Sequence, residues 1–137
     1  MKRLAVLLAG SLLSTTALAD AGDVGCFRSS GLKKPIRLQF GFPPENSDKG
    51  YVRYENGSAN IPVKLIKTES VEMAPGRPFE FTTTWKEATP GGGTYTVVSQ
   101  GAKVYGFTFV RAKDGKRFEF EQDLEALEEN GCRWKRR

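Results

Sequence analysis

Apolar and polar residues alternate along most of the chain after residue 35. The pattern is clearest at residues 79–86, where Phe79, Phe81, Thr83 and Trp85 share one parity and polar residues occupy the other. Alternation with a period of two places successive side chains on opposite faces of a pleated strand. It predicts strands at residues 36–42, 51–54, 61–67, 79–86, 95–99, 105–109 and 118–120.

Short segments rich in glycine, proline or asparagine separate these runs. Asn56-Gly57 and Asp114-Gly115 are two-residue hairpin signals, because their positions tolerate a positive φ. Gly101-Ala102 is expected to turn the chain, and residues 68–78 are expected to form a looser connection. Seven or eight antiparallel strands with short turns predict an all-β domain, either a small barrel or a sandwich. The barrel is favoured because closure removes exposed strand edges.

The end of the chain has a different pattern. Residues 123–129 contain good helix formers, with Asp123 as a cap and Gly131 as a stop. We therefore expect one short C-terminal helix of about two turns, which needs tertiary packing to persist.

The first 19 residues have the layout of a secretory signal peptide. A basic start at Lys2 and Arg3 precedes an apolar stretch and the small residues Ala17 and Ala19. Removing residues 1–19, which carry two of the 21 basic residues and none of the 16 acidic ones, leaves 118 residues with a net charge of +3. We expect residues 20–137 to form a single domain that is periplasmic or secreted, without a stable membrane anchor.

Export decides the expected state of the two cysteines. In an oxidising compartment, two thiols usually become one disulfide, so we expect a bridge between Cys26 and Cys132. It would close a loop of about a hundred residues, and the chain-entropy model gives a stabilisation of the folded state of ~4–5 kcal/mol for a loop of that length. A redox-active pair usually has C-x-x-C spacing, which these two residues lack.

The chain contains no histidine. This removes the usual general base and the commonest metal ligand, and it excludes Ser-His-Asp and Cys-His triads. A carboxylate pair such as Glu119 and Glu121 could still serve a glycosidase, but an acidic belt over residues 119–129 is more typical of a solvated face. We expect no enzymatic activity, no catalytic residues, no metal and no cofactor.

Four basic residues, Arg133, Lys135, Arg136 and Arg137, surround Trp134 at the C-terminus. Cations interleaved with an aromatic residue can bind nucleic acid or anionic lipid. An exported protein meets little nucleic acid but does meet anionic envelope polymers. A tail beyond the disulfide is the plainer interpretation, and no nucleic-acid partner is expected.

The segment from Ser99 to Tyr105 resembles the Ser-Gly-x-x-Tyr loop of bacterial periplasmic inhibitors of c-type lysozyme. The spacing from Ser99 to Cys132 and the Gly131-Cys132 ending are also similar. Those inhibitors are small exported barrels with a Cys near each end. The resemblance implies that a loop around Ser99 and Lys103, with Tyr105 beside it, enters the lysozyme cleft and hydrogen-bonds its carboxylates. Gln100 interrupts the motif.

The expected function is therefore that of an exported, non-enzymatic protein-binding domain, with lysozyme or another envelope-acting enzyme as the partner. Two alternatives remain open. One is a periplasmic carrier of a small apolar ligand, which would need a lined cavity. The other is an immunity or accessory protein for an envelope-acting toxin.

Overall fold

The structure is a computed structural model and describes residues 22–57, 59–101 and 103–134. The predicted leader at residues 1–19 lies outside the described residues, as do Ala102 and the last three basic residues of the tail. Within the described part, no helix is long and apolar enough to cross a membrane.

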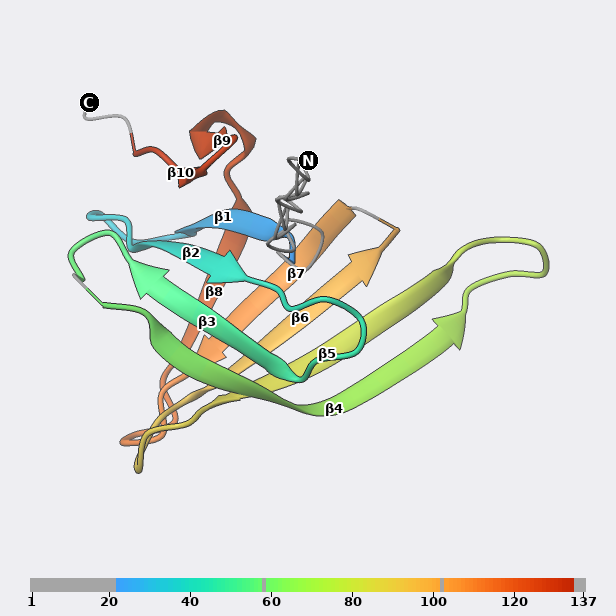
Figure 1. The fold of residues 1–137 in the computed structure, drawn as a ribbon, viewed down its shortest axis with the longest axis horizontal. Helices are drawn as coiled ribbons and strands as arrows, with labels where there is room; N and C mark the ends of the chain where they lie inside the picture. Colours follow the sequence, from blue (N-terminus) through green and yellow to red (C-terminus); the bar gives the residue numbers. More distant parts are fainter. Residues whose placement is uncertain (1–21, 58, 102, 135–137) are drawn as a thin grey trace, which may run out of the picture.

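Eight antiparallel strands form a closed barrel in which each strand pairs with the next one along the chain (Figure 1). Pairing of Phe27 on the first strand with Gln122 on the last closes the barrel. The fold prediction is confirmed, and the choice between a sandwich and a barrel is settled in favour of the barrel. The strands are β1 (Val24–Ser29), β2 (Arg37–Gly41), β3 (Lys49–Tyr54), β4 (Ile61–Glu72), β5 (Phe79–Glu87), β6 (Thr94–Gln100), β7 (Lys103–Val110) and β8 (Arg117–Gln122).

The inward residues of the alternating runs fill the barrel. Ring stacking between Phe27 and Phe107, with centroids 4.2 Å apart, packs β1 against β7 across the inner face of β8. Small barrels need such large inward side chains to exclude water from their centre. The buried core consists of Phe27, Leu38, Phe40, Val52, Val63, Trp85, Tyr95, Val97, Phe107 and Phe120.

Strand β1 has no clear alternation and is not among the runs predicted from the sequence. Gly25, Cys26 and Phe27 are consecutive buried residues. Phe27 points into the barrel, while Cys26 lies on the outer face and is covered by the C-terminal segment to which it is bonded. A strand buried on both faces loses the period of two that a half-exposed strand shows.

Strand β4 is longer than predicted, and the expected loose connection at residues 68–78 is wrong for residues 68–72. These residues pair with β5 as far as Glu72 opposite Phe79. Strand β3 pairs only with residues from Ile61 to Lys64, so the rest of β4 has β5 on one side alone. We call residues 66–82 the flap: its β4–β5 hairpin projects beyond the barrel wall (Figure 1).

The short C-terminal helix expected at residues 123–129 is confined to a single 3-10 turn, η2 (Leu124–Ala126). The Asp123 side chain makes no capping hydrogen bond, and the chain must turn back at once to bring Cys132 to β1. Two short strands, β9 (Leu127–Glu128) and β10 (Gly131–Cys132), make this return. The Arg133 N–H donates to the carbonyl of the buried Ala126 over 2.7 Å and holds the segment together.

The predicted disulfide is present between Cys26 and Cys132, with the two Cα atoms 5.7 Å apart. It fixes β10 against the outside of β1, as Figure 1 shows.

Candidate functional site

The barrel is packed through its middle but open at the end that carries the flap. A cavity of about 550 Å³ lies there, with Trp85, Val97 and Val104 on the wall formed by β5, β6 and β7. Phe42 and the segment around Leu124 and Leu127 form the facing wall. We call this cavity the mouth.

The mouth is open because the β7–β8 seam is incomplete. These strands pair only from Phe107 opposite Phe120 to Val110 opposite Arg117. At this end β8 turns towards β1, and residues 103–106 of β7 have only β6 as a neighbour. A second hollow of about 300 Å³ lies between residues 103–107 and Phe120–Leu124. The backbone of residues 103–106, which has no partner in β8, therefore lies at the same end of the barrel as the apolar lining of the mouth.

The flap carries two exposed aromatic side chains towards the mouth. Phe79 and Phe81 are 47% and 41% exposed, and their ring centroids lie 6.5 Å apart. They share the strand parity of Trp85, so the face that is core inside the barrel continues outwards along β5. The alternation at residues 79–86 puts both on the same face as Trp85, but alternation does not mark where the barrel wall ends.

The three residues expected to contact a partner lie in one hairpin but on two faces. Ser99 is half-buried, pairs with Val104 and lines the mouth. Lys103 pairs with Gln100 and is exposed on the opposite face. Tyr105, 48% exposed, donates to Glu80 Oε2 over 2.5 Å. The structure brings Lys103 and Tyr105 together and points Ser99 away from them.

The turn of this hairpin contains Gly101, which has φ of +60°. Such a conformation favours glycine. The tight turn explains the separation of the faces, since partners directly across a hairpin point the same way and neighbours along a strand do not. The hydrogen bond to Glu80 raises the pKa of the exposed Tyr105 above its usual value.

The opposite end of the barrel contains a buried chain of hydrogen bonds. The Tyr95 hydroxyl donates to Glu87 Oε1 over 2.8 Å and lies 2.6 Å from the Tyr54 hydroxyl. Because Tyr95 has one proton and gives it to Glu87, Tyr54 donates to Tyr95. Burial raises the pKa of Tyr54 to about 12 and raises that of Tyr95 well beyond the usual range. These hydrogen bonds join β3, β5 and β6 at this end of the barrel.

The carboxylates considered for glycosidase chemistry, Glu119 and Glu121, already form hydrogen bonds or ion pairs with neighbouring side chains. Glu119 accepts hydrogen bonds from Arg117 over 2.7 Å and from Thr108 over 3.0 Å. The hydrogen bond from Arg117 is the main reason why the pKa of Glu119 is lowered. Glu121 pairs with Arg28 over 3.0 Å. In the described ranges, no cluster of three or more His, Cys, Asp or Glu side chains could hold a metal ion.

No protein-family model, curated protein or solved structure matches this chain. The resemblance to the lysozyme inhibitors therefore stays a hypothesis, and the features that bear on function are the flap, the mouth and the Lys103 hairpin.

Proposed function

We propose that this protein is an exported, non-enzymatic binding domain that docks on another protein through its flap and mouth. The observation that carries the proposal is the exposed Phe79–Phe81 pair on a hairpin that projects beside an open apolar cavity. Contiguous exposed apolar surface on a folded domain marks an interaction site. Val71 and Met73 are also more than half exposed on the flap, but Val71 lies opposite Glu80 and so faces the other side from Phe79 and Phe81.

Export is supported by the leader pattern at residues 1–19 and by the disulfide between Cys26 and Cys132. Disulfides persist in the periplasm and outside the cell and are rare in a reducing cytosol. Mass spectrometry of the protein recovered from its producing cells tests this proposal. We expect an oxidised chain beginning at Asp20, and a reduced chain that still carries residues 1–19 would contradict it.

The concrete form of the proposal is inhibition of a c-type lysozyme. The exposed Lys103 ammonium, near the turn residue Gly101, is the group that would enter the cleft and donate to its catalytic carboxylates. Ser99 faces the mouth, so its hydroxyl can reach the partner only at the rim. Tyr105 would contact the partner on the Lys103 side.

A turbidity assay with c-type lysozyme tests this form. Excess purified protein should slow the lysis of bacterial cells, and Lys103→Ala should weaken the inhibition. The matched control is Lys113→Ala, which removes the same charge from the exposed turn at the other end of β7. Unimpaired lysis at excess wild-type protein would remove lysozyme as the partner.

The contribution of the flap is tested separately by the double variant Phe79→Ser with Phe81→Ser. Both side chains lie outside the core, so the variant should fold. Its affinity for the partner protein should fall roughly tenfold or more, as it does when aromatic residues at the centre of an interface are removed. Leu32→Ser, which removes an exposed apolar side chain from the β1–β2 loop, is the control. An equal loss in both variants would exclude the flap as the docking element.

The size of the mouth favours one second candidate, a carrier of a small apolar ligand. A cavity of about 550 Å³ falls within the range typical of ligand pockets. Because Trp85 lines the mouth, its fluorescence should change saturably when lauric acid is added to a Trp134→Phe variant. A spectrum that stays constant up to the solubility limit of lauric acid would reject the carrier.

A further inference from the structure

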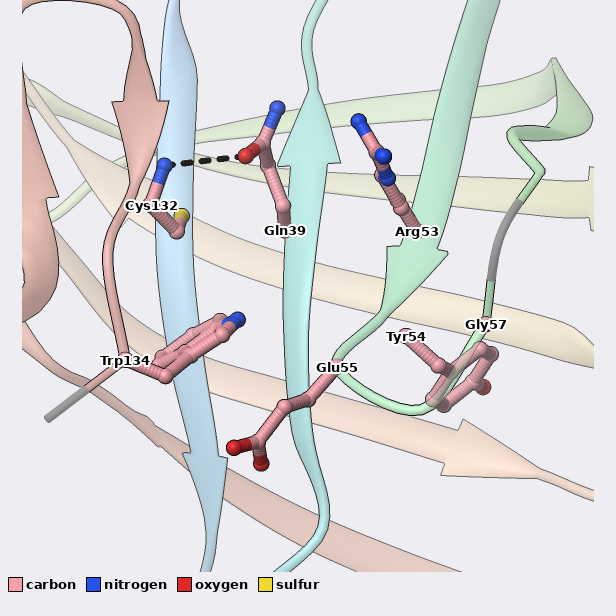
Figure 2. A pocket seen from close by; sticks show the side chains of 7 residues that line it. All are labelled: Gln39, Arg53, Tyr54, Glu55, Gly57, Cys132 and Trp134. Carbon is pink, nitrogen blue, oxygen red and sulfur yellow. Dashed lines mark hydrogen bonds between the residues drawn. The ribbon is translucent and has the colours of Figure 1, made fainter. Parts of the chain in front are cut away.

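A separate hollow of about 250 Å³ lies on the outer wall of the barrel, between β2, β3 and the C-terminal segment. It shares no lining residue with the mouth. Figure 2 shows the side chains that line it: Gln39, Arg53, Tyr54, Glu55, Gly57, Cys132 and Trp134.

The floor of this hollow is held in place by hydrogen bonds. Gln39 Oε1 accepts from the Cys132 N–H over 2.9 Å, and Gln39 Nε2 donates to the Tyr51 hydroxyl over 2.7 Å. The Tyr51 ring covers Gly41 so closely that a Cβ there would lie 1.9 Å from Tyr51 Cε1. With the disulfide to Cys26, these contacts fix the chain two residues before Trp134. A site prepared in this way loses little freedom when a ligand binds.

Two hydrogen-bond donors in the hollow have no protein partner within the described ranges. Arg53, opposite Gln39 in the strand register, makes no ion pair or side-chain hydrogen bond there. The same holds for Trp134, whose nitrogen-bearing edge points into the space between Gln39, Arg53 and Glu55 (Figure 2). Glu55 is already paired with Arg37 at 3.3 Å. The guanidinium of Arg53 is therefore the uncompensated charge of the hollow.

Arg133, which precedes Trp134, is paired with Glu128 at 3.8 Å. The positive charge available to a ligand in the hollow is therefore that of Arg53, and a carboxylate would match its planar guanidinium.

We propose that this hollow binds a saccharide that carries a carboxylate. The carboxylate pairs with Arg53, and the indole of Trp134 offers an apolar face to the C–H side of the sugar ring. Sugar hydroxyls can donate to the Glu55 carboxylate, whereas the side chains of an acidic peptide only accept hydrogen bonds and cannot. Gln39 keeps one amide hydrogen for a ring oxygen or hydroxyl.

NMR spectroscopy of the ¹⁵N-labelled, disulfide-intact protein can test the proposal with tri-galacturonic acid as the probe. The chain has two Trp residues, and the indole N–H of Trp85 is bonded to Thr83 Oγ1 inside the barrel. The Trp134 indole signal, assigned with Trp134→Phe, should shift saturably while the Trp85 signal stays. A shift of neither indole signal at saturating probe would overturn the proposal.

The role of Arg53 is tested by Arg53→Gln, which should weaken binding roughly tenfold or more, the usual effect of losing a hydrogen bond to a charged group. Arg77→Gln removes an equal charge from the exposed tip of the flap and should leave the affinity unchanged. Equal losses of affinity in the two variants would show that the probe is attracted by net charge alone and would contradict the proposed site.

Two further probes determine the class of the ligand. Neutral galactotriose should bind the wild-type protein at least roughly tenfold more weakly than tri-galacturonic acid, and Arg53→Gln should remove this preference. Equal binding of both sugars, or of tri-glutamate and tri-galacturonic acid, would contradict an acidic saccharide. Because the lysozyme assay depends on Lys103 and this titration on Arg53, each proposal can fail without the other.

Discussion

At the scale of single residues, Tyr95 combines a core ring with a buried polar group. Its ring stacks on Phe109 with centroids 4.6 Å apart, and its hydroxyl joins Tyr54 to Glu87. A buried hydroxyl without partners would cost free energy, so these two contacts are what allows a tyrosine at this position.

The variant Tyr95→Phe should therefore destabilise the fold by about 1–2 kcal/mol, because it removes two hydrogen bonds while keeping the ring. The midpoint of urea unfolding measures this change. Tyr105→Phe is the control: it loses only the exposed hydrogen bond to Glu80 and should stay within about 0.5 kcal/mol of the wild type. Equal losses in the two variants would show that the buried chain contributes nothing beyond a surface bond.

The same residues predict how stability depends on pH. Burial raises the pKa of Tyr54 from 10.0 to about 12 and shifts that of Tyr95 in the same direction. The folded state thus keeps protons that the unfolded chain releases near pH 10. This contribution to the free energy of unfolding is complete below pH 10 and is lost as the pH rises through 12.

We expect the urea midpoint to fall between pH 10 and 12, and to fall less steeply in Tyr95→Phe because one of the two shifted groups is gone. Unfolding curves at several pH values check both statements. An identical slope in wild type and variant would contradict the assignment of the pH dependence to this pair.

At the scale of elements, the flap differs from the rest of the sheet in having an open edge. Strand β4 pairs with both β3 and β5 at Val63 and Lys64 but only with β5 beyond that point. Lys67 and Glu69 form an ion pair of 2.9 Å along this edge, and charged residues there disfavour pairing with another strand.

Hydrogen exchange should separate the two halves of β4. Amides of residues 68–72 should exchange roughly tenfold or more faster than those of residues 61–64, because the flap has no core behind it. Exchange followed by NMR spectroscopy provides the measurement. Equal protection that grows with protein concentration would instead show that a second chain covers the edge.

The element scale also shows where sequence patterns are informative. Alternation predicted the strands β2 to β8, from Arg37–Gly41 to Arg117–Gln122, because one face of each strand is turned to the solvent and the other to the barrel interior. It missed Val24–Ser29, whose outer face is covered by β10. It also predicted a helix at residues 123–129, where helix propensity gives way to the return of Cys132 to β1.

At the scale of the whole molecule, the disulfide connects the first strand of the barrel to the last described segment. Cys26 and Cys132 are separated by 106 positions, so the bridge encloses almost the entire folded chain. Closing so long a loop restricts the unfolded state strongly.

Replacing both cysteines by alanine should lower the free energy of unfolding by about 2–5 kcal/mol, close to the loss of a native disulfide in other small domains. Urea unfolding of the double variant measures this, and the wild-type protein under strong reductant should behave alike. A loss below about 0.5 kcal/mol would mean that the bridge constrains only the C-terminal segment.

The class of the fold, the pairing of the two cysteines and the lack of histidine chemistry could be predicted from the amino-acid sequence. They follow from local alternation and from composition, which do not depend on how the strands are arranged. The positions of Phe79 and Phe81 outside the wall, and of Ser99 and Lys103 on opposite faces, became visible only in the folded barrel. The same is true of the hollow that Arg53 and Trp134 both line. Register, turn length and barrel closure set these positions, and all three depend on contacts between residues far apart in the chain.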